Sequence, residues 1–191
     1  IRVIDMTHDQ AGPACTQMLA WLGAEVIKIE VPDGKGDRAR WLRRDNPNLD
    51  SYFFLLLNNN KKSTTLNLKH HKGRDLFKVL IENSDVMVEN RGPGVMGRLG
   101  LDYETLAKIN PRLIYASVKG FGERGPYAEY KCFEPVAQAT SGAMSLTGYD
   151  HMPPAMLGSN VGDSGTGMHA VIGILAALVQ RNSTGKGQTV E

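Results

Sequence analysis

The chain has 191 residues, of which 41% are hydrophobic and 22% charged, and its formal net charge is +2. This length is enough for one domain with a sizeable core, and the composition is that of an ordinary globular protein. A small net charge without a basic tail argues against nucleic acid as a partner. No apolar stretch reaches the length of a membrane span, so we expect no membrane partner. Two cysteines are too few for a disulfide framework, which favours a cytoplasmic protein.

In chain order, the predicted elements alternate between strands and helices. Strands are expected at 1–5, 25–30, 63–68, 86–89 and 113–118, and helices at 14–22, 74–83, 103–109, 133–140 and 162–181. Residues 31–48 are polar and contain Pro and Gly, so we expect an exposed excursion there. The alternation predicts an α/β fold with a mostly parallel sheet in one domain, residues 1–191. Because both ends read as interrupted strands, we expect a piece of a longer protein.

The most informative motif is GDSGTGMH at 162–169, directly before an apolar run that predicts a buried helix. An aspartate at a helix start meets unpaired backbone N–H groups and the positive end of the helix dipole, and both favour the ionised form. An ionised carboxylate among small neighbours can attack a carbonyl carbon, so Asp163 is the candidate nucleophile. A simple helix-capping role is the main alternative. A catalytic Ser164, as in trypsin-like proteases, fits poorly because those proteins are all-β and disulfide-rich.

Other motifs carry weaker signals. Residues 92–97 match the GxGxxG pattern of dinucleotide-binding proteins, but the helix that follows is short. We infer only that backbone N–H groups of this turn could face a phosphate. His70 and His71 lack a carboxylate or thiolate partner at metal-ligand spacing, so we expect no metal site. Basic residues that suit a polyanionic ligand gather at Lys35, Arg38, Arg40, Arg43 and Arg44, and again at Lys61, Lys62, Lys69, Lys72 and Arg74.

Several short segments agree, in order, with one known family. They are QAGP at 10–13, LGAEVIKIE at 22–30, NKKS at 60–63, VEN at 88–90, PG at 93–94, NPRLI at 110–114, SVKGFG at 117–122 and GDS at 162–164. Together they span essentially the whole chain, which closely resembles the family III CoA-transferases. Within the family it looks most like members that transfer CoA from formyl-CoA to oxalate. The resemblance implies a Rossmann-like large domain, the N-terminal half of a longer chain, and a homodimer of two interlocked chains.

The resemblance also implies roles for individual residues. Asp163 matches the catalytic aspartate, and Gln10 could donate a hydrogen bond to a developing oxyanion. The positions that would contact CoA are Gln10, Ala11, Leu66, Asn67, Leu68, Lys69, Asn90, Arg91, Gly92, Arg98, Lys131, Cys132, Phe133 and Glu134. CoA enters as a thioester substrate, and we expect no permanently bound cofactor. Its phosphates would meet Arg98, Lys69 and Lys131.

The chain departs from the family pattern at positions that bear on acyl specificity. Val31 stands where the family commonly has an arginine that contacts CoA, and Arg38 or Arg40 could replace that arginine. The remaining departures replace aromatic residues or their hydroxyl groups. Phe53 and Phe133 stand where close relatives often carry tyrosine, and Leu42, beside Trp41, stands where formyl-CoA transferases carry tryptophan.

The expected reaction is transfer of CoA from an acyl-CoA, such as formyl-CoA, to a small carboxylate, such as oxalate, through a covalent aspartyl intermediate. Two alternatives stay open. An acyl-CoA racemase of the same family would move an α-proton with an Asp/His pair, and His169 lies six residues after Asp163. A non-catalytic CoA-binding protein would bind CoA and leave no covalent adduct.

Overall fold

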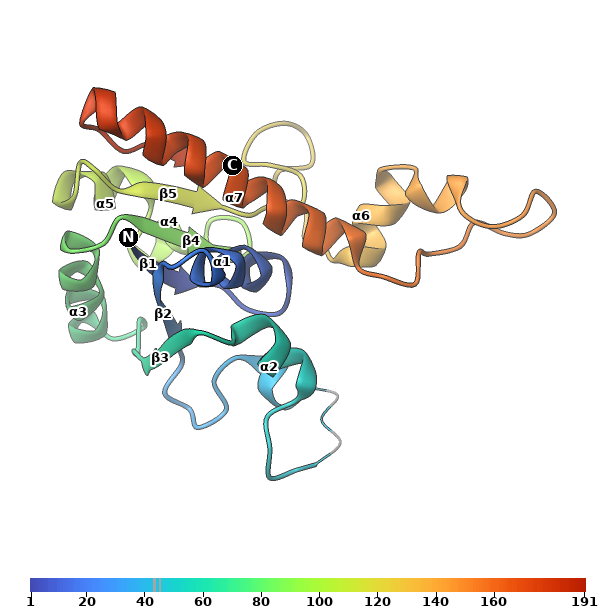
Figure 1. Cartoon of the computed structure of the whole chain (residues 1–191), viewed down its shortest axis with the longest axis horizontal. Coiled ribbons are helices and arrows are strands. Elements are labelled where there is room, and N and C mark those ends of the chain that lie inside the picture. Colours follow the sequence, from blue (N-terminus) through green and yellow to red (C-terminus); the bar gives the residue numbers. More distant parts are fainter. Residues whose placement is uncertain (43, 45) are drawn as a thin grey trace.

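A parallel sheet lies between two layers of helices in the computed structural model, which describes residues 1–42, 44 and 46–191 (Figure 1). Arg43 of the expected basic cluster lies outside the described residues. The strands are β1 (Arg2–Met6), β2 (Glu25–Glu30), β3 (Lys61–Thr65), β4 (Val86–Glu89), β5 (Ile114–Ser117) and β6 (Thr189–Val190). The α-helices are α1 (Ala11–Trp21), α2 (Tyr52–Asn58), α3 (His71–Glu82), α4 (Val95–Leu99), α5 (Tyr103–Ile109), α6 (Glu134–Thr140) and α7 (Val161–Thr184). Two short 3₁₀ helices are η1 (Arg38–Arg40) and η2 (Ala143–Leu146).

The six described strands follow the order β3-β2-β1-β4-β5-β6, and every neighbouring pair is parallel. Val3 of β1 lies opposite Val26 of β2 on one side and Val86 of β4 on the other. The strand order therefore reverses between β1 and β4. Doubly wound sheets of this kind bind ligands beyond the carboxyl ends of the strands at such a reversal. The predicted α/β fold with a parallel sheet is confirmed, and it directs attention to the loops after β1 and β4.

Residues of each central strand alternate between two hydrophobic cores, as the two-residue period of a strand requires. Val3 faces a core covered by α1 and α7, whereas the next residue, Ile4, faces a core covered by α3, α4 and α5. Ile174 of α7 and Phe77 of α3 are fully buried in these two cores. Strands β1 and β4 are therefore covered on both faces, which is typical of a parallel sheet.

Most predicted elements are confirmed with shifted ends, and β2, β4 and α5 coincide with their predicted ranges. Strand β3 begins and ends earlier than the predicted range 63–68, because Leu66 and Leu68 lie beyond the strand and pack against the core under α3. Helix α2 was missed because its apolar residues are consecutive and show no helical spacing. Its start is nevertheless marked by Ser51, whose hydroxyl accepts a hydrogen bond from the backbone N–H of Phe54 at 3.0 Å.

Most described residues of the segment 31–48 are exposed, as predicted, but its middle is partly buried. Asp37 and Ala39 are buried, and Arg40 forms ion pairs with Glu30 and Asp50. These charge pairs fix the middle of the segment against the end of β2, whereas most of its other described residues are exposed as predicted.

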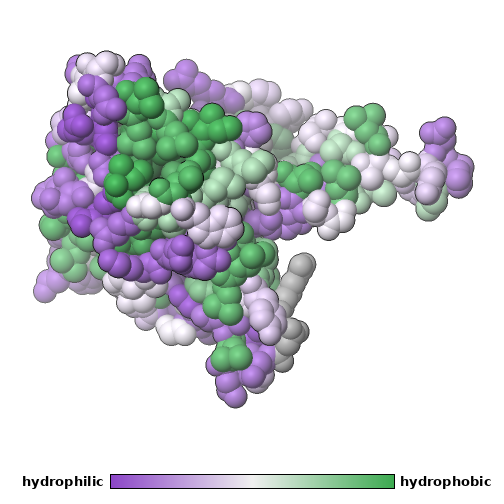
Figure 2. Space-filling view, in the orientation of Figure 1, coloured by the Kyte–Doolittle hydropathy of each residue, from purple (hydrophilic) through white to green (hydrophobic). Residues whose placement is uncertain are grey.

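Helix α7 corrects the expectation that no apolar stretch reaches membrane length. Its 24 residues are long and apolar enough to cross a membrane by length and composition alone. The prediction considered only the central apolar run, whereas the helix begins nine residues earlier, at Val161. One face of α7 packs on α1 and the sheet through Val171, Ile174 and Ala177. On another face, α7 exposes an apolar stripe that consists of Met168, Ile172, Leu175 and Val179. We call it the α7 stripe, and it forms part of the apolar surface in Figure 2.

Helices α7 and α1 approach each other closely at Gly167. A Cβ atom at this position would lie 2.8 Å from the carbonyl oxygen of Ala11 and 3.0 Å from the Cβ atom of Ala14. A Cβ atom at Gly165, on the same helix, would meet nothing within 4 Å. The two glycines therefore differ in packing but share a helical backbone.

We expect Gly167→Ala to lower the Tm of the full-length protein, because overpacking at a helix contact costs about 1–3 kcal/mol. Gly165→Ala is the matched control and should raise the Tm slightly, since alanine favours a helix over glycine by roughly 1 kcal/mol. Thermal unfolding followed by circular dichroism measures both shifts. Equal shifts in the two variants would contradict close packing as the reason for glycine at Gly167.

Candidate functional site

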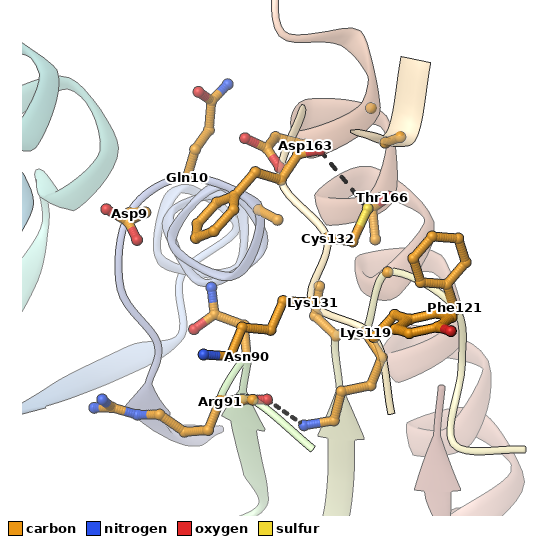
Figure 3. A pocket seen from close by; sticks show the side chains of 18 of the residues that line it. Asp9, Gln10, Asn90, Arg91, Lys119, Phe121, Lys131, Cys132, Asp163 and Thr166 are labelled. Atoms are coloured by element: carbon orange, nitrogen blue, oxygen red, sulfur yellow. Dashed lines mark hydrogen bonds between the residues drawn. The ribbon is translucent and has the colours of Figure 1, made fainter. Parts of the chain in front are cut away.

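A cavity of about 380 Å³ opens at the carboxyl ends of β1, β4 and β5, where the strand order predicts a ligand site (Figure 3). Its walls come from the loops after these three strands, the segment 128–133 and the first turn of α7. The residues that line it include His8, Asp9, Gln10, Ala11, Arg38, Asn90, Arg91, Gly92, Lys119, Phe121, Lys131, Cys132, Phe133 and Asp163. The sheet topology thus gathers groups that lie far apart in sequence.

Asp163 lies in the first turn of α7, but it does not cap the helix. The N-cap position belongs to Asn160, which makes no side-chain capping hydrogen bond. Among the described residues, the Asp163 carboxylate accepts no hydrogen bond, although it is half-buried and lines the cavity. The simple capping interpretation is therefore not supported, and the carboxylate remains available to a ligand.

The start of α7 is stabilised by Glu134, the first residue of α6. Its carboxylate accepts hydrogen bonds from the backbone N–H groups of Gly162, at 3.0 Å, and Asp163, at 2.6 Å. Gln138 donates to the same carboxylate at 2.6 Å. Glu134 is buried, so it supplies from outside the helix the acceptor that the N-cap residue lacks. The sequence placed Glu134 among the CoA contacts, whereas in the structure it does not line the cavity.

The pKa of Asp163 is raised to about 6, first by burial and then by the negative charges of Glu134 and Asp9. This value agrees with the expectation that Asp163 is ionised at neutral pH, but the shift is opposite in direction to the one that a helix terminus produces. The helix dipole contributes at most about 2 kcal/mol even in partly buried sites, and here burial and like charges outweigh it. Asp163 is still mostly ionised at neutral pH, and it is more basic than an ordinary aspartate.

Gln10 connects the loop after β1 to the start of α7. It occupies the N-cap position of α1, and its Nε2 atom donates to the hydroxyl of Ser164 at 3.0 Å. Its carbonyl oxygen accepts a hydrogen bond from Asn160. The Gln10 amide therefore lies beside Asp163, with one N–H still free for a ligand among the described residues. Ser164 accepts from Gln10 and has no hydrogen bond to a histidine in the described chain, which argues against serine chemistry.

The loop from Thr7 to Gln10 is fixed by contacts on its buried side. The Nζ atom of Lys28 donates to the carbonyl oxygen of Thr7 at 2.8 Å and pairs with the carboxylate of Asp37 at 2.9 Å. Both side chains of this ion pair are only 1% exposed. Asn90, on the next loop, accepts from the backbone N–H of His8 and donates to its carbonyl oxygen. The Asn90 amide is therefore engaged with the protein itself.

A second buried ion pair lies under the same loop. Lys61 pairs with Asp5 at 3.0 Å, and both side chains are at most 2% exposed. Burial alone would raise the pKa of Asp5, but Lys28 and Lys61, together with hydrogen bonds from Thr16 and Thr7, hold it far below its ordinary value. The charges beneath the cavity are thus paired with one another, and they leave the groups on the cavity wall to interact with a ligand.

The residues predicted to contact CoA divide into two groups. Those that line the cavity with Asp163 are Gln10, Ala11, Asn90, Arg91, Gly92, Lys131, Cys132 and Phe133. Those that lie outside it are Leu66, Asn67, Leu68, Lys69, Arg98 and Glu134. Leu66 and Leu68 pack against the core, whereas Lys69 and Arg98 are exposed on the surface. Arg91 lines the cavity, but its guanidinium donates to the carbonyl oxygen of Met6 at 3.1 Å.

Sequence reasoning overlooked part of the cavity wall. Lys119 and Phe121 follow β5 and line the cavity, and Lys119 donates to Glu89 at 2.6 Å and to the carbonyl oxygen of Arg91 at 2.7 Å. Their segment, SVKGFG, carries part of the family resemblance, but the sequence did not predict that it lines the site. The rule that ligands bind at the carboxyl ends of parallel strands would have found it.

The positions at which the chain departs from the family pattern also separate in space. Phe133 and Arg38 line the cavity, and the guanidinium of Arg38 lies 5.4 Å from the centre of the Phe133 ring. Val31, Trp41 and Leu42 are exposed and do not line it. Phe53 is half-buried outside the cavity, and Arg40 is paired with Glu30. Of the two arginines considered as replacements, only Arg38 reaches the cavity.

We expect Glu134→Gln to lower the pKa of Asp163, because it removes the negative charge that disfavours the ionised form most. The measurement is the titration of the Asp163 side-chain carbon by NMR in the full-length protein, assigned by comparison with Asp163→Asn. The midpoint starts near 6 and moves toward lower pH.

Glu82→Gln is the matched control, since Glu82 is exposed on α3, and it should leave this midpoint in place. A midpoint that stays near 6, or rises, in Glu134→Gln would mean that Glu134 does not set the basicity of Asp163.

Comparison with known proteins gives a consistent picture. The chain matches the family described as CoA-transferase family III over residues 1–191. It is 55% identical over 190 residues to the formyl-CoA:oxalate CoA-transferase of Streptomyces avermitilis, and 52% identical over 190 residues to the protein of that name from Rhodopseudomonas palustris (strain BisA53). These alignments cover 100% of this chain but 46% and 44% of the two relatives. The chain therefore spans about half the length of the curated relatives it matches.

Solved structures agree with the sequence relatives. A CAIB/BAIF family protein from Brucella suis superposes with a TM-score of 0.94 at 38% identity, covering 100% of this chain and 51% of that one. A hypothetical protein from Mycobacterium tuberculosis superposes with a TM-score of 0.89 at 33% identity, covering 100% of this chain and 52% of that one. A family match over every residue, with high identity to curated members, leads to one conclusion: the chain belongs to CoA-transferase family III.

Proposed function

We propose that the full-length protein transfers CoA from an acyl-CoA, such as formyl-CoA, to a small carboxylate, such as oxalate, through a covalent intermediate on Asp163. In this proposal, residues 1–191 are the CoA-binding part of the large domain. The family and the printed names of the relatives support the class of reaction. The observation that carries the proposal is a basic Asp163 carboxylate, which accepts no hydrogen bond from the described residues, on the wall of a cavity at the reversal point of the sheet.

The chemistry begins with the ionised Asp163 carboxylate. It attacks the thioester carbonyl carbon, forms a C–O bond and breaks the C–S bond, which releases CoA thiolate and leaves a mixed anhydride. The thiolate then attacks the aspartyl carbonyl carbon, which releases the first acid and leaves an aspartyl thioester of CoA. Each step exchanges one activated acyl group for another of similar energy, so the sequence of steps requires no ATP.

The acceptor carboxylate reverses these two steps. It attacks the aspartyl thioester and expels CoA thiolate, and the thiolate attacks the acceptor's carbonyl carbon, so Asp163 is released as a carboxylate. Gln10 is suited to stabilise the oxyanion of these steps, because its amide is fixed beside Asp163 by Ser164 and Asn160. A fixed donor costs no reorganisation as charge develops.

The partner in solution is, in this proposal, a second copy of the same full-length chain. The α7 stripe is exposed in residues 1–191, and the segment from α6 to α7 projects away from the sheet and exposes Leu146 and Tyr149 (Figure 1). Apolar surface of this extent favours coverage by further protein. The two cysteines, Cys15 and Cys132, are both free, as in a cytoplasmic protein.

The racemase alternative receives less support from the geometry. His169 is exposed and contacts the carbonyl oxygen of Gly165 on its own helix at 2.7 Å. His8 lines the cavity, but its ring faces Arg91 at 3.2 Å. Among the described residues, no histidine forms a hydrogen bond with Asp163, and a proton-transfer pair needs such a contact or a bridging water.

We expect Asp163→Asn in the full-length protein to fold normally, bind CoA and lose CoA transfer by at least roughly a thousandfold, the scale seen when a nucleophile is removed. The amide preserves size, but it cannot form the anhydride. Transfer rates with formyl-CoA and oxalate, and the Tm, are the measurements.

A second readout locates the adduct. Wild-type protein incubated with acyl-CoA and digested should yield a peptide that carries CoA or acyl mass on Asp163, and Asp163→Asn should yield none. An adduct on Ser164 or Cys132, or substantial turnover by freshly prepared, mass-verified Asp163→Asn, would contradict the mechanism. CoA binding without any adduct or turnover in the wild type would favour the non-catalytic alternative.

Lysine substitutions test which basic residues bind the phosphates of CoA. Lys131 lines the cavity and is exposed, whereas Lys69 lies outside it. We expect Lys131→Ala to raise the KM for formyl-CoA about tenfold, the effect of one lost charge-assisted hydrogen bond. Lys69→Ala, the matched comparison, should change this KM less than twofold. The reverse order would place the phosphates along the segment after β3 instead.

A further inference from the structure

Arg38 is a cation on the cavity wall, and its surroundings suit the binding of a carboxylate group that belongs to a ligand. Its Nε atom donates to the carboxylate of Asp9 at 2.5 Å, and its guanidinium lies over the Phe133 ring at 5.4 Å. Among the described residues, the two terminal nitrogens of Arg38 make no hydrogen bond. Two parallel N–H groups of this kind fit the two oxygens of a carboxylate. The side chain is 48% exposed and lines the cavity, so it is open to a ligand there.

The Arg38 side chain is held in place from two directions. Asp9 has a φ of 61°, a left-handed conformation that is uncommon outside glycine and is most tolerated by Asn and Asp. A residue held in that region next to a functional site suggests a functional reason. The side chain of Asp9 meets Arg38 in this conformation, and its backbone N–H points to Asp37 at 3.4 Å. The ring of Phe133 supports the other side of the guanidinium.

Both supports of Arg38 also connect to Asp163. Asp9 precedes Gln10, which donates to Ser164, the neighbour of Asp163. Phe133 precedes Glu134, which accepts from the backbone N–H of Asp163. Arg38 and Asp163 therefore line the same cavity. Each support of Arg38, Asp9 or Phe133, is followed in the chain by a residue that is hydrogen-bonded to Asp163 or to its neighbour Ser164. A group bound by Arg38 would share the cavity with the nucleophile of the proposed reaction, whereas the phosphates of CoA are separated from the thioester by the whole pantetheine arm.

Charge balance gives an independent reason for a cation at this place. Asp163, Glu134 and Asp9 are three carboxylates close enough to influence one another, so a dicarboxylate that enters beside them meets repulsion. Of the other cations on the wall, Lys119 is bound to Glu89, and Arg91 is bound to Met6 and faces His8. Within the part of the chain that the structure describes, Lys131 is the remaining cation of the wall, and the proposed function assigns it to CoA. Arg38 is paired with Asp9 through Nε, but among the described residues its two terminal nitrogens make no hydrogen bond, so they can offset a second negative charge at the acyl group.

We propose that Arg38, oriented by Asp9 and Phe133, binds the carboxylate that is not activated in a dicarboxylic substrate and so selects acids with two carboxylates over acids with one. This inference rests on the proposed function and specifies its substrate class. Arg38 is a binding residue in this scheme, and Asp9 is a positioning residue that acts through it.

The test uses the full-length protein with formyl-CoA as donor and either oxalate or acetate as acceptor. In Arg38→Met, kcat/KM for oxalate should fall about tenfold or more, the loss expected for a charge-assisted pair. The KM for formyl-CoA and kcat/KM for acetate should stay within about twofold. Arg38→Lys keeps the positive charge but loses the paired N–H groups of the guanidinium, so it should recover part of the oxalate activity. This variant also keeps the inference testable if Arg38→Met does not fold.

Lys35→Met is the matched control, since Lys35 is an exposed cation of the same segment outside the cavity. It should change none of these constants. Three results would overturn the inference: a rise in the KM for formyl-CoA without an oxalate effect, which would assign Arg38 to a CoA phosphate; an equal loss for oxalate and acetate, which would make its role structural; or no change.

Oxalate binding measured by calorimetry separates this inference from the proposed function. Binding by the wild type that is lost in Arg38→Met supports Arg38 as the carboxylate site even if the wild type transfers no CoA, and then only the proposed reaction fails. Equal oxalate affinity in the wild type and Arg38→Met overturns the inference even if the wild type transfers CoA to oxalate.

Discussion

The first turn of α7 depends on a carboxylate that belongs to another helix. Glu134 accepts hydrogen bonds from the backbone N–H groups of Gly162 and Asp163 and so satisfies donors that Asn160 leaves unpaired. The same negative charge disfavours the ionised form of Asp163 and raises its pKa. One buried side chain therefore stabilises the helix terminus and makes the neighbouring carboxylate more basic. Both effects require that α6 stays packed against α7, so the basicity of Asp163 is a property of tertiary packing.

The opposite wall of the cavity is fixed by a different device. Two ion pairs, Lys28 with Asp37 and Lys61 with Asp5, lie beneath the loop after β1 with almost no exposure to solvent. A buried pair of this kind contributes little net stability, but losing one partner leaves an unpaired buried charge at a cost of about 3–5 kcal/mol. The loop that carries Gln10 is therefore strongly confined to one geometry. Confinement of this kind is what a preorganised hydrogen-bond donor needs.

The fold could be read from the sequence where local patterns were strong. The β-branched run of β2 and the apolar run within α7 marked their elements, and the motif before that run located Asp163 at the helix start. The role of Glu134 could not be read in this way, because it depends on α6 packing against a helix whose first residue lies 27 positions later. Arg38 reaches the cavity from a segment without periodicity. Leu66 and Lys69 matched the family in order along the chain, yet the end of β3 at the sheet edge leaves them outside the cavity.

The direction of the Asp163 pKa shift shows which physical effect dominates at this site. A helix terminus favours a carboxylate charge by about 0.3–1 kcal/mol when exposed, whereas burial and like charges can shift a pKa by several units. The sequence displays only the first effect, because the helix start is local and the burying residues are distant. The outcome suits a nucleophile: with a pKa of about 6, Asp163 is mostly ionised at neutral pH, yet it binds electrophilic carbon more strongly than a carboxylate held at a low pKa. A stronger helix-terminus effect would increase the ionised fraction only slightly and would reduce the reactivity of every ionised molecule.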